Sequence, residues 1–368
     1  MNNELLYQIA LTLVPQVGTV QARLLVEKIG SAQAIFKTSP RQLEKIEGIG
    51  SVRAKNIHLF KNFAEAEREI RFLEKYKIKP LFLTNEEYPR RLLHCYDPPT
   101  LLYYRGEADL NSSRIVSVIG TRSNTDYGKQ LVETLVKDLS SQQVVVISGL
   151  AFGVDALAHR AALKQHLPTV AVLAHGLDTI YPDQHYPLAR EIAKQGGGLL
   201  TEFRSNIKPD KHNFPTRNRI VAGLCDALVV IESGTKGGSM VTAELANGYN
   251  KDIFAFPGKI SDAKSSGCNH LIKINKAVLL SSTDELLQAM GWLNTKKTHI
   301  KKQKELFIQL SDHEKIITDL LKQHEELSID ELNFLAALSS SAVAAAILNL
   351  EFEGIITSLP GKRYKLMD

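Results

Sequence analysis

Short apolar runs alternate with helix-length amphipathic segments through the middle of the chain. The runs are rich in β-branched side chains, end in small or polar residues, and occupy 114–122, 144–149, 169–176, 197–202, 226–233 and 252–258. Apolar runs of this length are typical of strands that are buried on both faces of a parallel sheet. Because helix-sized segments separate them, the pattern predicts an α/β fold whose core is a doubly wound, extended Rossmann-like parallel sheet.

The segments before this core have different patterns. Residues 1–70 have helical periodicity, with glycine turns ahead of amphipathic helices in 15–31 and 43–57. The second of these resembles a helix-hairpin-helix, so we predict a small helical, helix-hairpin-helix-like domain over 1–70. Residues 72–113 are rich in proline and aromatic residues and contain short alternating runs. We expect them to add strands to the edge of the main sheet within a core domain over 71–290.

The turn Gly48-Ile49-Gly50 has two interpretations. Its backbone N–H groups can bind a phosphate, with Arg53 and Lys55 nearby. Alternatively, the glycines only end one helix and begin the next. The sequence leaves both interpretations open.

The last part of the chain predicts a linker followed by a winged helix. Residues 291–305 are rich in lysine, and 306–368 contain three helical patterns followed by two strand patterns around a Pro-Gly turn. A helix that reads base edges should present Arg, Lys, Asn or Gln. The third helix has no basic residue between Leu338 and Glu351. We therefore favour a docking or regulatory role for this winged-helix domain over reading of a DNA groove.

Composition narrows the class of protein. A hydrophobic content of 44% is ample for a core, and no apolar run is long enough to span a membrane. The N-terminus lacks the charged segment and the apolar segment of a signal peptide. Three widely spaced cysteines argue against a disulfide framework or a thiolate zinc site and favour a reducing cytoplasm. The net charge of +5 is a mild indication of a nucleic-acid partner.

The strongest candidate for binding is the segment 202–220. Between 204 and 219 it holds five Lys or Arg residues and a single acid, Asp210, with Phe214 among them. Single-stranded nucleic acid needs cations that follow the phosphates and an aromatic ring on which a base can stack. We expect Arg217 and Arg219 to lie at the N-terminus of the following helix, where free N–H groups favour an anion.

Two other loops carry weaker signals. The glycine-rich stretch 232–246 can wrap a phosphate with backbone amides. Asp155 and His159 are four residues apart, hence on one helical face, and can form a hydrolytic base with its orienting acid. We favour a structural role for that pair. No loop matches G-x-G-x-x-G or G-x-x-x-x-G-K-[ST], so neither a dinucleotide site nor an ATP-hydrolysing motor is predicted.

Ordered motifs give the chain a family resemblance. They are YP..L....DPP..L...G (88–106), VIGTR (118–122), SGLAFGVDALAH (148–159), GLD..YP (176–182), FP.RNR (214–219), GGSMVTA (237–243) and FPG (256–258). The chain thereby resembles the DNA-processing protein A family (DprA, also called Smf). The resemblance implies a bacterial cytoplasmic protein, not an enzyme, that binds and protects incoming single-stranded DNA. It also implies loading of the RecA recombinase in natural transformation and a homodimer through the core, with no cofactor, metal or membrane insertion.

The resemblance also implies a DNA pocket at the end of the sheet. Its residues in this chain are Arg122, Ser148, Gly149, Lys211, Phe214, Arg217, Asn218, Arg219, Gly238 and Ser239. The family usually has S-G-S-L in the glycine loop, whereas this chain has G-G-S-M at 237–240, which removes one hydroxyl donor. For the dimer, apolar residues near the end of the core offer a surface: Leu271, Ile272 and Ile274.

Two rival functions come from other classes. The fold and the stretch GGS..TAE (237–244) also distantly resemble nucleotide phosphoribohydrolases that activate cytokinins, which place a glutamate after a Gly-Gly pair as Glu244 is placed here. The spacing to Thr242 differs, and the basic, Phe-containing loop has no use in such an enzyme. A sequence-specific regulator acting through the winged helix is disfavoured by the uncharged third helix.

Overall fold

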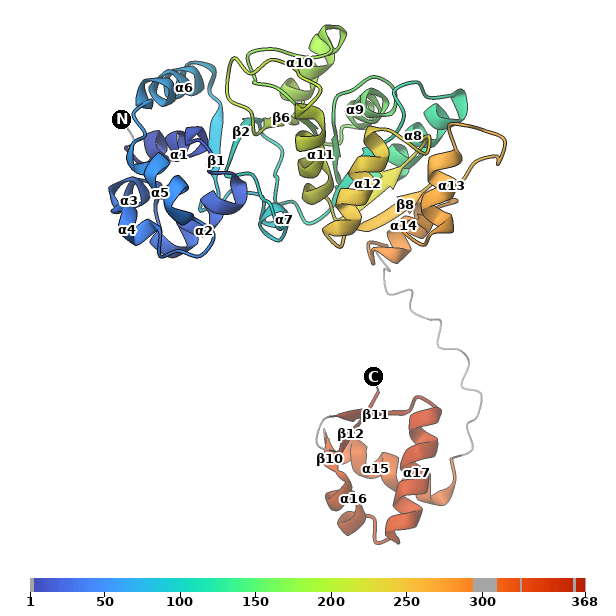
Figure 1. Cartoon of the computed structure of the whole chain (residues 1–368). Coiled ribbons are helices and arrows are strands. Elements are labelled where there is room, and N and C mark those ends of the chain that lie inside the picture. The colour runs from blue at the N-terminus through green and yellow to red at the C-terminus, as the bar shows by residue number, and fades with distance from the viewer. Residues whose placement is uncertain (1–2, 294–309, 325, 360–361, 368) are drawn as a thin grey trace. The chain divides into compact units, whose positions relative to one another are not determined.

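The computed structural model describes residues 3–293, 310–324, 326–359 and 362–367. The chain divides into two compact units, Met1–Leu293 and Asn294–Asp368 (Figure 1). Most of the predicted linker, with all five of its lysines, lies outside the described residues.

A nine-stranded sheet forms the centre of the first unit, within the part of the chain that the structure describes. Its strands are β1 (Lys79–Phe82), β2 (Leu101–Gly106), β3 (Ile115–Ile119), β4 (Val145–Ser148), β5 (Thr169–Val172), β6 (Gly198–Thr201), β7 (Ala227–Val230), β8 (Asp252–Ala255) and β9 (Val278–Leu279). The order is β1-β2-β6-β5-β4-β3-β7-β8-β9. All neighbours from β6 to β9 are parallel. The prediction of a doubly wound parallel core is confirmed.

Helices cover both faces of this sheet (Figure 1). They are α7 (Arg90–Leu93), α8 (Asp126–Leu139), α9 (Val154–Lys164), α10 (Tyr186–Lys194), α11 (Asn213–Leu224), α12 (Gly238–Gly248), α13 (Ser266–Lys273) and α14 (Thr283–Ala289). All five residues of β3 are buried. Ile115 and Ile119 join one core cluster with α11, α12 and α13, while Val116 and Val118 join another with α8, α9 and α14. This alternation explains why the run is apolar at nearly every position.

Strands β1 and β2 extend the sheet beyond β6. Both pairings, β1 with β2 and β2 with β6, are antiparallel. The expectation that residues 72–113 add strands to the sheet edge is therefore confirmed. Buried residues of the N-terminal helices share a core cluster with Phe82, Leu101 and Tyr103 of these strands. The N-terminal helices are α1 (Asn3–Leu13), α2 (Thr19–Ile29), α3 (Ala32–Lys37), α4 (Pro40–Leu43), α5 (Gly50–His58) and α6 (Phe63–Tyr76).

The guanidinium of Arg53, beside the Gly-Ile-Gly turn, donates its hydrogen bonds to backbone carbonyls. Gly48 and Gly50 both have positive φ, at 86° and 64°, which glycine adopts without strain. The Arg53 guanidinium donates to the carbonyl oxygens of Gln16, Gly48 and Ile49 at 2.9–3.4 Å. Arg53 thus holds the turn to the preceding helices, which favours the interpretation that these glycines shape the helical packing.

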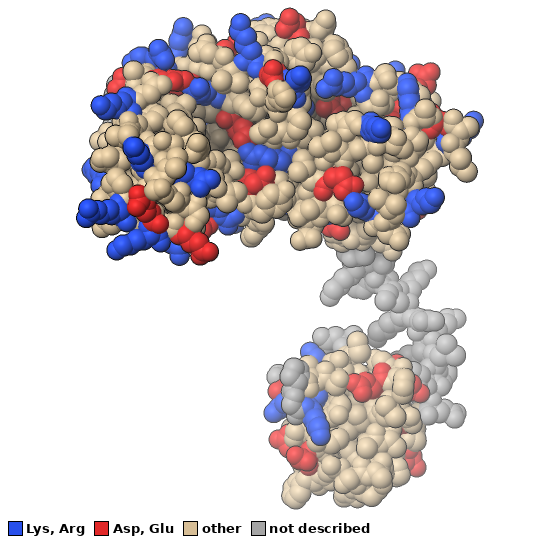
Figure 2. Space-filling model, in the orientation of Figure 1, with Lys and Arg blue, Asp and Glu red and all other residues tan. Residues whose placement is uncertain are grey.

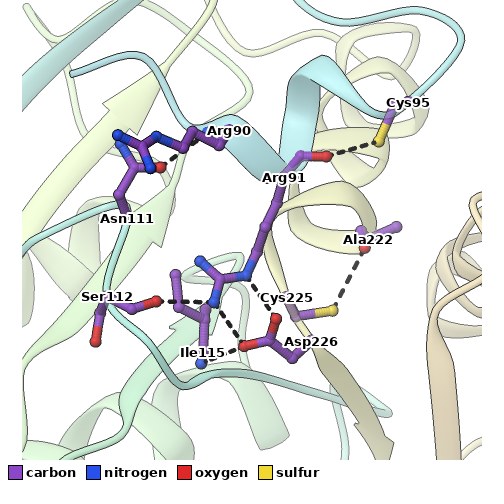
Figure 3. A network of polar contacts seen from close by, with 9 residues as sticks. All are labelled: Arg90, Arg91, Cys95, Asn111, Ser112, Ile115, Ala222, Cys225 and Asp226. Atoms are coloured by element: carbon purple, nitrogen blue, oxygen red, sulfur yellow. Dashed lines mark hydrogen bonds and ion pairs between the residues drawn. The ribbon is translucent and has the colours of Figure 1, made fainter. Parts of the chain in front are cut away.

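A bidentate ion pair joins α7 to the core strands (Figure 3). Nε and Nη2 of Arg91 contact the two carboxylate oxygens of Asp226 at 2.7 and 2.8 Å. Nη2 also donates to the Ser112 carbonyl, and Asp226 accepts from the backbone N–H of Ile115 at 2.9 Å. One charge pair therefore holds together the segment before β3, the first residue of β3 and the residue before β7.

The second unit is a winged helix, as predicted. Its elements are α15 (Asp312–Gln323), β10 (Leu327–Ser328), α16 (Ile329–Leu335), α17 (Ser340–Phe352), β11 (Ile356–Leu359) and β12 (Arg363–Leu366). The three strands form one antiparallel sheet in the order β10-β12-β11. Helix α17 carries no Lys or Arg. Among the described residues no single helix is long and apolar enough to cross a membrane, and α16 and α17, bent by 118°, meet that test of length and composition only as a pair.

Candidate nucleic-acid interface

A cavity of about 440 Å³ opens where β3, β4 and β7 end. Segments 119–122, 149–155, 214–221 and 234–242 contribute its walls, and we call it the central cavity. From β3 the chain proceeds to β4, β5 and β6 on one side, and later returns to β7 and β8 on the other. The loops after β3 and β7 diverge at this switch point, which is where open α/β sheets bind ligands.

Two arginines lie close to one aromatic ring in the cavity. The guanidinium carbons of Arg122 and Arg217 lie 5.6 and 5.9 Å from the Phe214 ring centroid. Arg122 is exposed, Phe214 is half-buried and Arg217 is buried. The loop after β3 and helix α11 thereby place two cations beside a ring that solvent can reach. This arrangement can hold a phosphate and stack a base at adjacent positions.

Arg217 is fixed by the ends of two strands. Its Nη1 donates to the carbonyl oxygens of Gly149 and Val172, and its Nε donates to Asn218 Oδ1 at 3.1 Å. Burial lowers the pKa of Arg217 to about 10, so the guanidinium stays charged at neutral pH. A Cβ at Gly149 would lie 2.6–2.8 Å from the guanidinium atoms. A side chain at position 149 would therefore displace the Arg217 guanidinium from this position.

Asp155 places a carboxylate in the same cavity. Burial raises its pKa, and the charge of Arg217 opposes that shift. The carboxylate accepts from the Ala151 N–H at 3.3 Å, within the loop that begins α9. His159 instead contacts Thr169 Oγ1 at 2.7 Å through Nδ1. Each of the two residues therefore has its own partner, which favours the structural interpretation over an acid–base pair.

The glycine-rich loop forms the opposite wall. Helix α12 begins at Gly238, after Gly237 at a φ of 138°. Asn218 Nδ2 donates to the Gly238 carbonyl at 3.3 Å, and the hydroxyls of Ser239 and Ser233 are 2.7 Å apart. Lys236 also lines the cavity. Sequence reasoning missed Lys236, although this only cation of the loop was a signal that could have identified it.

The structure brings seven of the ten expected DNA-binding residues to the central cavity. They are Arg122, Gly149, Phe214, Arg217, Asn218, Gly238 and Ser239. Ser148 lies just beneath, and its buried hydroxyl donates to the Val118 carbonyl at 2.7 Å. Lys211 is exposed two residues before the start of α11 and does not line the cavity.

Arg219 has a different environment from the one expected. Helix α11 begins at Asn213, so Arg217 and Arg219 lie inside the helix and not at its N-terminus. Because two residues span about 200° of a helix, the two side chains leave on opposite sides. Arg219 pairs with the Glu202 carboxylate and donates to the Asp97 carbonyl. Burial raises the pKa of Glu202 to about 7, an effect that the Arg219 charge opposes.

A small aromatic hollow of about 30 Å³ adjoins the central cavity. Arg122, Phe214 and Arg217 line both spaces. Tyr181 and Phe152 add rings that are 48% and 44% exposed, and the Tyr181 and Phe214 centroids are 6.0 Å apart. The exposed aromatic side chains of the central cavity and of this hollow therefore adjoin one another.

The surface charge of this unit is mixed on the face in view. Lys and Arg side chains are interspersed with Asp and Glu over the larger unit in Figure 2. Local arrangements of cations and rings, as around Phe214, are therefore more informative than the overall field.

Each part of the chain matches a model of a known protein family or domain. A family model described as DNA recombination-mediator protein A matches residues 79–291. A DprA winged-helix model matches 306–362, and a SAM-like tandem helix-hairpin-helix model matches 9–60. A Synechocystis protein named Smf is 32% identical, with 99% of each chain covered.

Two solved structures share the fold. The DNA processing protein A of Streptococcus pneumoniae is 30% identical at a TM-score of 0.66, with 77% of this chain and 97% of that chain covered. The same protein from Helicobacter pylori is 32% identical at a TM-score of 0.53, with 58% and 95% covered. The Helicobacter structure is described as showing a single-stranded DNA binding mode.

Proposed function

Since the chain belongs to the DNA-processing protein A (DprA/Smf) family, we propose that it binds single-stranded DNA in the central cavity. In this proposal the protein takes part in natural transformation, where it protects incoming strands and loads the RecA recombinase onto them. The single-stranded DNA binding described for the Helicobacter relative supports the choice of ligand.

The observation that carries the proposal is the placement of the Arg122 and Arg217 guanidinium carbons 5.6 and 5.9 Å from the Phe214 ring centroid at the switch point of the sheet. A duplex keeps its bases stacked on one another, whereas a single strand can offer one to Phe214. Lys236 and the N-terminus of α12 give the backbone phosphates further positive partners. The cavity therefore suits a strand with unpaired bases.

The test is a competition titration of the whole protein with an oligonucleotide and with its duplex, each at several salt concentrations. We expect preference for the single strand and an affinity that falls linearly on a logarithmic salt scale. Equal affinity for the two forms would contradict the proposal. RecA loading and protection are tested separately, by filament formation and by nuclease resistance of the bound strand.

A phosphoribohydrolase remains the rival from another class. Glu244, the residue that would correspond to its glutamate, lies outside the central cavity and pairs with Lys276 at 2.6 Å. A carboxylate held by a neighbouring ammonium on a different surface has no access to a ligand beside Phe214. We therefore propose binding and not catalysis. Release of adenine from adenosine monophosphate by the purified protein would reverse this choice.

The homodimer of the proposal needs an apolar surface on the core, and the structure changes which residues offer one. Leu271 is fully buried in the core and Ile272 packs against it. Ile274 is 39% exposed, and the edge strand β9 exposes Val278 and Leu279. We propose that these three residues meet their copies. Ile274→Glu should then convert a dimeric mass to a monomeric one in light scattering, while Leu293→Glu, a control change at another exposed apolar position, should not.

The proposed cellular location is the cytoplasm. Cys95, Cys225 and Cys268 are free thiols, and burial raises the pKa of each of them. Protonated, buried thiols are compatible with a reducing compartment.

A further inference from the structure

A second groove lies at the antiparallel edge of the sheet, outside the proposed DNA cavity. It has a volume of about 600 Å³, and α6, the end of β2 and α10 contribute its walls. In Figure 1 these helices lie near the β2 and β6 end of the sheet. We call it the edge groove. Its cationic and tyrosine side chains are Tyr76, Lys77, Arg105, Tyr186, Arg190 and Lys194.

The edge groove has unpaired positive charge. Its four cations are all exposed and face two acidic residues, Glu107 and Asp178. Among the residues that the structure describes, none of the four cations forms an ion pair within 4.0 Å. Cations that have no internal partner attract a polyanion and release its counterions on binding.

Aromatic rings accompany these cations. Tyr186 is 61% exposed and Tyr76 is 41% exposed. The Tyr76 ring lies 4.8 Å from that of Phe72, which fixes its position on α6. Cations that follow a backbone, combined with rings that solvent can reach, are the combination that binds unpaired nucleic acid.

Consecutive residues of one loop line the edge groove and the aromatic hollow beside the central cavity. Residues 177–180 line the edge groove, and the next residue, Tyr181, lines the aromatic hollow beside Phe214. The loop after β5 therefore contributes to the edge groove and to the aromatic hollow. A strand that leaves Phe214 past Tyr181 reaches the edge groove by crossing this loop.

We propose that the edge groove is a second contact site for the same DNA strand, with phosphates at Arg105 and Arg190 and an unpaired base at Tyr186. The inference rests on the proposed function, because it extends the strand bound in the central cavity. Its ligand class is a polyanion with accessible bases, read without regard to sequence. We therefore expect substitutions in the edge groove to weaken the binding of long strands and not of short ones.

A different groove supplies the matched control. The space between α8 and α9 is also basic, with Lys129, Lys137, Arg160 and Lys164 in its lining. It has no aromatic lining residue and shares none with the central cavity. Replacing Arg160 and Lys164 by Ala removes the same charge as replacing Arg105 and Arg190. The control therefore separates a defined site from the general attraction of a basic protein for DNA.

The experiment measures the affinity of the full-length protein for thymidylate oligonucleotides of about 5 and about 20 nucleotides. For the longer strand, Arg105→Ala with Arg190→Ala should weaken binding about tenfold and reduce the salt slope by about 1.4, which is the loss of two single-strand phosphate contacts. Tyr186→Ala should weaken binding about tenfold with little change in slope. Neither variant should alter binding of the short strand.

The outcomes distinguish this inference from the function on which it rests. If the unmodified protein fails to bind the short strand, the proposed function is wrong. If the short strand binds normally but the edge-groove variants bind the long strand like the unmodified protein, only this inference is wrong. Equal losses in the edge-groove variant and in the Arg160/Lys164 control would also overturn it, because the effect would then be general electrostatics.

Discussion

At the scale of single residues, we propose that Arg122 binds a phosphate and Phe214 a base in the central cavity. Arg122 is exposed and presents a planar fork that matches a phosphate, whereas Phe214 offers a ring face to a base. Arg122→Ala should weaken binding of a short oligonucleotide and reduce the slope of log affinity against log salt by about 0.7. Phe214→Leu should weaken binding by about 1–3 kcal/mol with the slope nearly unchanged.

Fluorescence titrations of both variants at four salt concentrations check this division. Lys208→Ala is a suitable control, because it removes a charge from the same basic segment outside the cavity lining. The strand would bind elsewhere on the protein if both variants changed the slope alike or neither changed the affinity.

The buried His159 predicts a pH dependence of stability. The Thr169 hydroxyl donates to the Val146 carbonyl, so it can only accept from His159 Nδ1, and we assign the proton to Nδ1. Nε2 is buried with no partner among the described residues. Burial lowers the pKa of His159 to about 3, with smaller contributions from His185 and Arg217.

The direction of this pH dependence follows from the protonation of His159 in the folded and unfolded states. The unfolded histidine binds a proton below its ordinary pKa of about 6.5, while the folded one stays neutral, so stability is full above about 6.5 and declines as the pH falls toward 3. Between pH 7 and pH 5 the expected loss from this group is about 2 kcal/mol. Urea titrations followed by the fluorescence of Trp292, the only tryptophan, measure it. His159→Leu should remove most of that pH difference; an unchanged difference would assign it to other groups.

At the scale of elements, the Arg91–Asp226 pair holds the segment before β3 to β3 and β7, the strands whose following loops line the central cavity (Figure 3). Asp226→Ala leaves a half-buried guanidinium and the Ile115 N–H without their shared acceptor. We expect a loss of about 2–3 kcal/mol in unfolding free energy, measured by urea titration. Glu87→Ala breaks the exposed pair with Lys79 and should change stability by less than about 1 kcal/mol. Equal effects would show that the network adds no stability beyond a surface pair.

The positions of the strands and helices were largely predictable from local pattern. A strand such as β3 is buried on both faces, so its residues are apolar at nearly every position and the run is visible in the sequence. The beginning of α11 was not predictable in the same way. The segment Asn-Phe-Pro-Thr from Asn213 to Thr216, which has no helical apolar pattern, forms its first turn, so Arg217 lies deeper in the helix than the apolar pattern indicated.

At the scale of the whole molecule, the winged helix should be dispensable for binding a short strand. Helix α17 has no basic residue, and Arg363 of β12 pairs with Glu326 at 3.1 Å. A chain ending after Lys304 should keep its affinity for a short oligonucleotide within about twofold, because the cavity lies wholly in the first unit. A second chain ending after Leu293 removes the lysine-rich segment and isolates its contribution by difference. A large loss on removing only residues 305–368 would show that the winged helix itself binds DNA.

The sequence by itself determined the repeating units and the loops at the sheet edge, because a buried strand, a glycine turn and a basic-aromatic loop each leave a pattern within about ten residues. Phe214, Arg217, Gly238 and Ser239 lie in loops that such patterns identified, whereas Arg122, Gly149 and Asn218 followed from the resemblance of the ordered motifs to a known family. Even the winged helix was recognisable from its succession of three helices and two strands.

Only the tertiary structure decided which cations line the central cavity. Arg217 and Arg219 are two residues apart in a basic segment, yet the rotation of α11 turns one toward the cavity and the other toward Glu202. The edge groove likewise joins Tyr76, Arg105 and Arg190, which are far apart in the chain. Such convergence depends on strand order and on the packing of helices over the sheet, and no local pattern encodes either of them.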